Sequence, residues 1–485
     1  MSNCIVAPDT RTFERFQFTF PEQIESEHFI VHFTTSNADS QFVNEQWLNL
    51  QCNFGYAQSV IELAEYALAI FMEADWEMMP PDCDEGITDE ESPNHCNNFG
   101  GNALYDIYLA NDAVGLVAPE NPYPVEPYIG GFTSFMQVTP LGNEHTFVPD
   151  WSVHVIAHEL HHAIQIRYGT SVSGEPGNYA YNGWLYEQTS TYMENVIFPA
   201  SYHFLVMMGN CNITSPLTYP EISIDSSVDI YQYRSALWQK FLVEAYGDST
   251  INRLIWEGFG LETATGNPVN MFPIYESALQ TVTDGVTTLG DAYQDYALWR
   301  YFTGSRSRPG EFFMQAASYC TANLLAIEET STTFPSEKGG ARLVKLLPYE
   351  TNLLLASSAY DNLLVQHISF SEEDEILMSS IEVNGEESFF QLYNPAGDNH
   401  ALLITSEYTG EPGEEIEFTL ANTVPFMEGD ITGDSMVNVQ DIIVQINIIL
   451  HQIDPTEYQW LAADLDENNV VDVLDVILLV NLILG

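Results

Sequence analysis

His158-Glu-Leu-His-His162 is the stretch of sequence on which the interpretation of this chain depends. In a helix, residues i and i+4 project from the same face one turn apart, so His158 and His162 can direct ring nitrogens at one metal ion. Glu159 lies beside them, near enough to accept a proton from metal-bound water without being a ligand. The motif therefore predicts two zinc ligands and a general base.

The segment around the motif has the signals of a helix with a buried face. Asp150 is a candidate N-cap, and Gly169 follows the last turn. Apolar residues recur at helical spacing: Val153, Ile156, Ala157, Leu160 and Ile164. A buried helix that carries imidazole and carboxylate groups needs a compensating partner, and a metal ion supplies one. His161 lies outside the ligand spacing and His154 lies one turn before His158, so we expect both beside the site without coordinating the ion.

A catalytic zinc ion needs a third protein ligand and an open position for water. The metzincin pattern, with Gly and a third His at fixed offsets, fails because Gln165 and Tyr168 occupy those positions. The remaining option is a Glu on a following helix, and Trp184-Leu-Tyr-Glu187 offers one. Glu194, two turns later, is the alternative ligand.

The HELHH motif followed by a Trp-Leu-x-Glu helix resembles the gluzincin metallopeptidases, most clearly over residues 150–250. The resemblance implies one catalytic zinc ion with Glu187 as its third ligand. This chain departs from the aminopeptidase pattern at Gln188-Thr189, and Thr191 replaces the acidic residue of thermolysin-like enzymes. The resemblance therefore does not determine which residues orient the ligands here.

Tyr231 and Tyr233 precede a segment that resembles the gluzincin helix carrying an oxyanion-stabilising tyrosine. Either residue is a candidate for that role, and packing is the alternative for both. The segment Gly130–Val138 has the pattern of a strand, and gluzincins present an edge strand before the motif helix to pair with the substrate backbone. In aminopeptidases that strand carries a Glu for the free N-terminus. This strand has none, which favours an endopeptidase acting on polypeptides.

An internal repeat, residues 429–450 and 463–484, carries oxygen ligands at the spacing of a calcium-binding loop. The predicted ligands of the first loop are Asp430, Thr432, Asp434, the carbonyl of Met436, Asn438 and Asp441. Those of the second loop are Asp464, Asp466, Asn468, the carbonyl of Val470, Asp472 and Asp475. Each loop precedes an apolar helix. The repeat closely resembles a type I dockerin, which implies two structural calcium ions and a cohesin-like scaffold protein as partner. Packing within the chain is the alternative.

These features predict an α+β multidomain chain. We expect a gluzincin-type metallopeptidase domain over residues 1–328, with a mixed α/β N-terminal part and a helical C-terminal part. A polar linker over 329–342 follows, then a small β-sandwich over 343–425 with short alternating runs, and an all-α dockerin-like pair over 426–485.

The composition excludes some partners. Asp and Glu number 69 against 12 Lys and Arg, giving a formal net charge of −57, so we expect neither nucleic acid nor membrane insertion. The N-terminus has no signal-peptide pattern, yet the modules favour an extracellular or surface-attached location. Cys83 and Cys96 flank an acidic loop and are candidates for a disulfide, with free thiols as the alternative.

The sequence thus predicts a secreted zinc endopeptidase. The alternative is a catalytically inactive protein with a gluzincin fold, serving as a binding or scaffold-assembly module through its dockerin-like tail.

Overall fold

The computed structural model divides the chain into two compact units. The first comprises Met1–Tyr219, Ile224–Ala292 and Phe302–Ala322, and the second comprises Pro220–Ser223, Tyr293–Tyr301 and Asn323–Gly485. The structure describes residues 15–43, 46–83, 86–89, 95–110, 115–170, 182–200, 202–265, 269–326, 332–337, 339–346, 351–358, 363–370, 376–383, 388–393, 399–406, 415–422, 427–434, 436–455, 457–466, 468 and 470–484.

The first unit is built on a five-stranded sheet. Its strands, in spatial order, are β1 (Glu22–Glu25), β2 (Phe29–Phe33), β5 (Tyr105–Tyr108), β7 (Phe132–Val138) and β6 (Gly115–Pro122). The central pairs β2–β5 and β5–β7 are parallel, whereas β1 and β6 run antiparallel to their neighbours. The predicted strand before the motif helix is confirmed as β7. Its prediction as the edge strand is wrong, because β6 pairs along its outer side and forms the edge.

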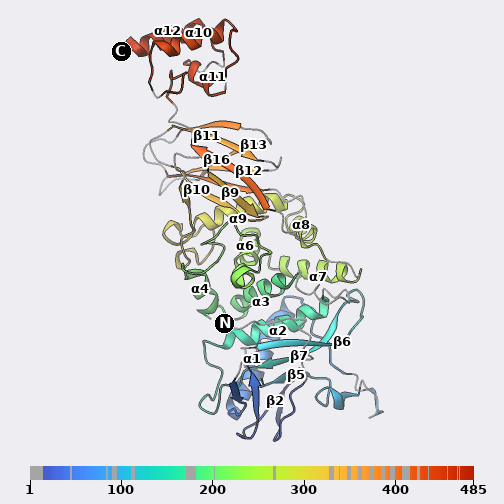
Figure 1. Cartoon of the computed structure of the whole chain (residues 1–485). Coiled ribbons are helices and arrows are strands. Elements are labelled where there is room, and N and C mark those ends of the chain that lie inside the picture. The colour runs from blue at the N-terminus through green and yellow to red at the C-terminus, as the bar shows by residue number, and fades with distance from the viewer. Residues whose placement is uncertain are drawn as a thin grey trace. The chain divides into compact units, whose positions relative to one another are not determined.

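Two helices cover one face of this sheet (Figure 1). Helix α1 (Phe54–Glu73) packs against β2, and α2 (Val153–Tyr168), which carries the motif, packs against β7 and β6. The predicted helix end at Gly169 is confirmed, but Ser152 is the N-cap instead of Asp150. Only the first two residues of α2 are not buried, so burial extends beyond the predicted apolar stripe to the polar residues of the motif.

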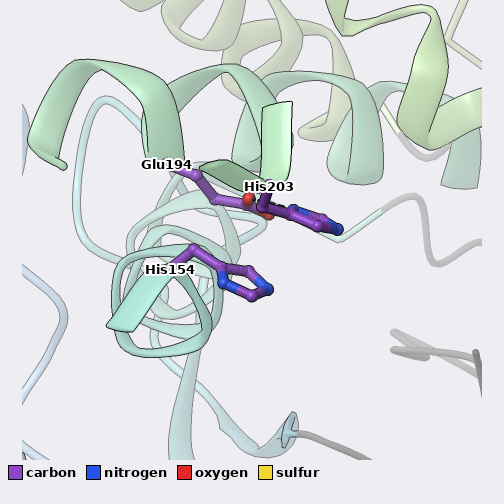
Figure 2. A group of neighbouring side chains, drawn as sticks. All are labelled: His154, Glu194 and His203. Atoms are coloured by element: carbon purple, nitrogen blue, oxygen red, sulfur yellow. Dashed lines mark hydrogen bonds and ion pairs between the residues drawn. The ribbon is translucent and has the colours of Figure 1, made fainter. Parts of the chain in front are cut away.

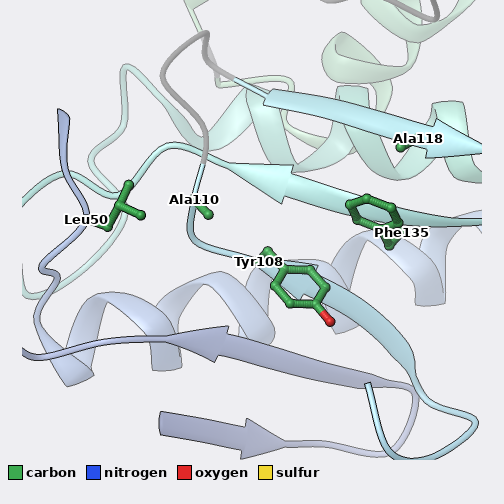
Figure 3. Packing of buried hydrophobic residues seen from close by; sticks show 5 residues of the cluster. All are labelled: Leu50, Tyr108, Ala110, Ala118 and Phe135. Atoms are coloured by element: carbon green, nitrogen blue, oxygen red, sulfur yellow. The ribbon is translucent and has the colours of Figure 1, made fainter. Parts of the chain in front are cut away.

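The opposite face of the sheet holds its own core. Figure 3 shows Tyr108 of β5, Phe135 of β7 and Ala118 of β6 packed with Leu50 and Ala110. Beside this cluster the Arg15 guanidinium forms ion pairs with three acidic groups: Asp82, Asp106 and Glu120. These contacts tie the start of the described chain to the sheet, because a buried cation is stable only when it is paired.

The rest of the unit is helical. Its elements are α3 (Gly183–Ile197), α4 (Tyr202–Gly209), η3 (Val228–Ile230), α5 (Tyr231–Arg234), α6 (Ala236–Tyr246), α7 (Ile251–Thr263) and α8 (Met271–Val282), and α9 (Leu289–Tyr301) follows in sequence. Helix α3 packs against α2 on one side and against α5 and α6 on the other. The predicted disulfide between Cys83 and Cys96 is confirmed, and a second joins Cys211 to Cys320.

The second unit contains two sheets of mostly antiparallel strands. One has the order β13 (Leu377–Val383), β12 (Leu363–Phe370), β15 (Asn399–Ser406), β10 (Arg342–Lys345) and β8 (Leu325–Ala326). The other has the order β14 (Ser388–Tyr393), β11 (Thr351–Ser358), β16 (Glu415–Asn422) and β9 (Thr332–Glu337). Strand β9 falls inside the segment predicted as a linker, of which residues 329–331 and 338 lie outside the described residues. Because β9 pairs with β16, the structure places this segment in the sheet.

The C-terminal segment is helical, as predicted. Helices α10 (Val439–Ile449) and α12 (Val473–Leu484) pack together, and α11 (Glu457–Ala463) lies between them in sequence. Their shared core consists of Ile431, Ile448, Ala462, Ala463 and Leu479. In the part of the chain that the structure describes, no helix is both long enough and apolar enough to cross a membrane.

Candidate metal centre

The motif helix α2 and the following helix α3 bring three donor groups to one point. Nε2 of His158 lies 3.1 Å from Nε2 of His162 and 3.0 Å from Oε2 of Glu187. Nε2 of His162 lies 3.4 Å from the same Glu187 oxygen. All three side chains are buried. The structure therefore brings together the three residues predicted as zinc ligands.

Hydrogen bonds on the far side of each imidazole fix its tautomer. Nδ1 of His158 donates to Oε1 of Glu194 at 2.7 Å, since a carboxylate only accepts. Nδ1 of His162 donates to Oε1 of Gln165 at 2.7 Å. The Gln165 amide is oriented in turn, because its Nε2 donates to the carbonyl of Tyr186. Each neutral imidazole thus carries its proton on Nδ1 and directs the Nε2 lone pair at the other ring and at Glu187.

This arrangement fits a tetrahedral zinc ion. Two donors that each lie about 2.05 Å from such an ion are about 3.3 Å apart. The three observed separations bracket that value. Three electron-pair acceptors that face one another without a proton between them repel, and a bound cation removes the repulsion. The donor set of two imidazoles and one carboxylate leaves a fourth position for water, as catalytic zinc sites require.

Glu159 lies next to the ligands and against the edge strand. Its side chain is fully buried on α2. A Cβ placed on Gly115, the first residue of β6, would lie only 2.5 Å from Cγ of Glu159. The glycine is therefore the residue that leaves room for this carboxylate, and it brings the backbone of the edge strand to the site.

Of the two predicted tyrosines, Tyr233 has its ring beside that of His158. Its ring stacks against His158 with centroids 6.0 Å apart, whereas Tyr231 is buried at the start of α5. The turn before them has left-handed backbone at Asp229 and at Ile230, where φ is 56°. A β-branched residue rarely adopts that conformation, so the turn that positions Tyr233 is strained.

A second layer of ionisable groups surrounds His158. Glu194, weighed as a rival zinc ligand, instead holds His158 through Nδ1, and its other oxygen accepts from His203 at 2.6 Å. His154 stacks on His203 with centroids 4.0 Å apart. Burial lowers the pKa of His154 to about 4, so that imidazole is neutral near pH 7.

Sequence reasoning missed several of these residues. Gln165 entered only as a departure from another motif, yet it positions both His162 and His161. His203 carried no motif at all, because its role depends on the packing of α4 against α3. Gly115 also gave no signal, since its importance comes from the approach of Glu159 across the fold.

The second calcium loop brings together three of its four predicted acidic ligands. Carboxylate oxygens of Asp464, Asp466 and Asp475 lie within 4.8 Å of one another. Asp475 is fully buried and accepts backbone hydrogen bonds from Leu465 and from Asp472. Asp472 and Asn468 accept from backbone amides two residues further on, those of Leu474 and Val470.

The first calcium loop has the same plan. The Thr432 hydroxyl lies 3.3 Å from Oδ1 of Asp430 and 2.9 Å from Oδ1 of Asp441. Asn438 caps α10 and its amide donates to the carbonyl of Met436, while Asp434 accepts from the Met436 amide. Residues at the same position of the two loops therefore make similar hydrogen bonds in the structure.

Comparison with known families identifies the C-terminal module. Residues 428–484 match the type I dockerin domain, so the prediction of a dockerin is confirmed. The match supports calcium binding, an extracellular location and a role in assembly on a cohesin-bearing scaffold. Residues 146–275, which span α2, α3 and Tyr233, match a family of unknown function (DUF6055). That match leaves the gluzincin resemblance untested, and no curated protein was found to match the chain.

Proposed function

We propose that the first unit is a zinc-dependent endopeptidase that the dockerin delivers to an extracellular scaffold. One observation carries the proposal: two imidazole lone pairs and the Glu187 carboxylate converge with tetrahedral spacing beside a buried glutamate on the motif helix. Residues that only stabilise the fold do not require three metal-binding groups to face one another. The donors fit zinc, and the neighbouring carboxylate fits a general base.

The chain's own residues account for the proton transfers. When bound, zinc acidifies a water ligand and polarises the substrate carbonyl. Glu159 accepts the proton from the attacking water and passes it to the nitrogen of the leaving amine. The ring of Tyr233 stacks on His158, and we assign its hydroxyl the role of donor to the oxyanion as it develops. Glu194 and Gln165 hold the two histidines in the tautomer that binds the metal.

The edge strand favours internal peptide bonds as the substrate. Strand β6 offers its outer backbone groups next to Glu159, and an extended polypeptide pairs with such an edge. The one acidic residue of β6, Glu120, lies roughly 16 Å along the strand from Gly115. It is also paired with Arg15. With that carboxylate engaged, β6 has no group to bind the amino terminus that an aminopeptidase recognises.

Cleavage of unstructured casein by wild type and Glu159→Gln, with zinc content measured on both, tests the proposal. We expect both proteins to hold zinc and the variant to lose about 10²–10⁴-fold in turnover, because only the general base is removed. Glu73→Gln, a change at an exposed position of α1, is the matched control and should cleave like wild type.

The remaining outcomes separate the alternatives. Zinc in both proteins with no cleavage by either favours an inactive, dockerin-bearing scaffold component, the second candidate that the dockerin match supports. Wild type without zinc contradicts the proposed metal centre itself.

A further inference from the structure

A second cluster of metal-binding side chains lies beside His158 and takes no part in the proposed mechanism. His154 of α2, Glu194 of α3 and His203 of α4 each offer a ligand atom, and these atoms lie within 4.8 Å of one another. Figure 2 shows the two imidazole rings extending in the same direction, with the carboxylate of Glu194 next to His203. We propose that this cluster binds a second divalent transition-metal ion.

Helix geometry explains why the two clusters are neighbours. His154 precedes His158 by one turn on α2, and Glu194 follows Glu187 by two turns on α3. The contacts between α2 and α3 that assemble the first site therefore place a second His and Glu together further along the same helix pair. His203 joins the second set from α4. Its Nδ1 donates to Oε2 of Glu194 at 2.6 Å, and this proton has to leave when an ion binds.

The donor chemistry selects the kind of ion. Two imidazoles and one carboxylate suit zinc, cobalt or nickel, whereas calcium and magnesium prefer oxygen ligands alone. Glu194 is only 2% exposed, and hydrogen bonds from His158 and His203 offset its buried charge. A bound ion takes over that role from the proton of His203. Nδ1 of His154 is buried and has no hydrogen-bond partner among the described residues, which is unusual for a buried polar atom. To coordinate one ion, the stacked rings of His154 and His203 have to tilt toward each other.

The two sites share the carboxylate of Glu194. Its Oε1 accepts from Nδ1 of His158, and its Oε2 faces His203. An ion at the second site withdraws electron density from this carboxylate and so alters the ligand strength of His158. Occupancy of one site should therefore be visible in the spectrum of an ion in the other.

Cobalt(II) titration of the full chain, with calcium in excess to fill the dockerin loops, tests the inference. Visible absorption follows the binding, and elemental analysis after dialysis counts the ions. We expect two equivalents of cobalt in wild type. One should be lost in His162→Asn and the other in the double variant His154→Asn/His203→Asn. His451→Asn is the matched control and should keep both, because His451 is exposed in the dockerin and asparagine tolerates its left-handed backbone.

The count distinguishes this inference from the proposed function. One equivalent that disappears in His162→Asn and persists in the double variant overturns the second site and leaves the peptidase centre intact. One equivalent that persists in His162→Asn and disappears in the double variant supports the second site and contradicts the peptidase centre. No bound cobalt in wild type overturns both. If the double variant does not fold, His203→Gln replaces it, since the His203 side chain is 26% exposed at the start of α4.

Discussion

The metal centre and the calcium loops of this chain are built in opposite ways. Each calcium loop has its predicted ligands within twelve consecutive positions, residues 430–441 and 464–475, so residue spacing alone defines it. The metal centre has its candidate ligands on two helices that residues 169–182 separate, and the hydrogen bonds that His158 and His162 donate to Glu194 and Gln165 fix the two rings. The difference predicts that the calcium loops depend on their ions for structure, whereas the metal centre is preorganised by the fold.

Removal of calcium should have the largest effect on structure, and it should affect the dockerin without affecting the metal centre. The dockerin has a small core of five buried hydrophobic residues, while its loops hold several carboxylates in close proximity. Without calcium those carboxylates repel, and ion binding and folding are coupled. We expect a calcium chelator to abolish amide protection across residues 428–484 and to leave protection of α2 and α3 unchanged. Hydrogen exchange followed by peptide mass spectrometry measures both regions in one experiment. Loss of protection in α2 would show that the centre is not preorganised.

Gly115→Ala tests preorganisation at the metal centre. The added methyl group would lie 2.5 Å from Cγ of Glu159, so the general base must move. A displacement of about 1 Å costs on the order of 10²-fold in turnover. We expect that loss in casein cleavage, with zinc content unchanged because neither His158 nor His162 is touched.

The control for this variant is Gly183→Ala at the start of α3, where an added Cβ meets no atom within 4 Å. It should cleave like wild type. Equal losses in both variants would indicate a general effect of the substitution on the fold.

The same contrast between local and distant construction explains what could be predicted from the sequence. The ligand pair His158 and His162 and both calcium loops are predicted by spacing along a helix or a loop. The structure brings together His158 with His162, Thr432 with Asp430 and Asp441, and Asp464 with Asp466 and Asp475. The third ligand, Glu187, required a resemblance to known enzymes, because the sequence between α2 and α3 does not determine how they pack. The order of strands in the sheet depends on pairing between distant segments, which is why β7 was mistaken for the edge strand.

Gln165→Leu should weaken zinc binding more moderately. The substitution keeps approximate volume but removes the acceptor for Nδ1 of His162, so the imidazole loses its fixed tautomer and orientation. Loss of such a partner lowers metal affinity by about 10–100-fold. Competition with a chromophoric zinc chelator measures the affinity. Gln58→Leu on the exposed side of α1 is the control and should bind zinc like wild type. An unchanged affinity in Gln165→Leu would show that the fold orients His162 without this hydrogen bond.

Thr432→Asp should have the smallest effect, and it sharpens the comparison within the dockerin. Among the side-chain ligands predicted, the second loop has four carboxylates: Asp464, Asp466, Asp472 and Asp475. The first loop has three, Asp430, Asp434 and Asp441, and Thr432 stands where the second has Asp466. Calcium affinity rises with the number of charged ligands, so wild type should bind one ion several-fold more tightly than the other.

Adding the missing carboxylate to the first loop should bring its affinity close to that of the second. The Thr432 hydroxyl already lies 2.9 Å from Oδ1 of Asp441, so an aspartate there faces the same ion. The charge has an opposite effect without calcium, since a carboxylate next to Asp430 and Asp441 destabilises the ion-free loop. Calorimetric titration of wild type, Thr432→Asp and Thr432→Ser separates the two effects. Serine keeps a hydroxyl oxygen and should leave the affinity unchanged. If aspartate also leaves it unchanged, residue 432 is not a calcium ligand and the first loop departs from the plan of the second.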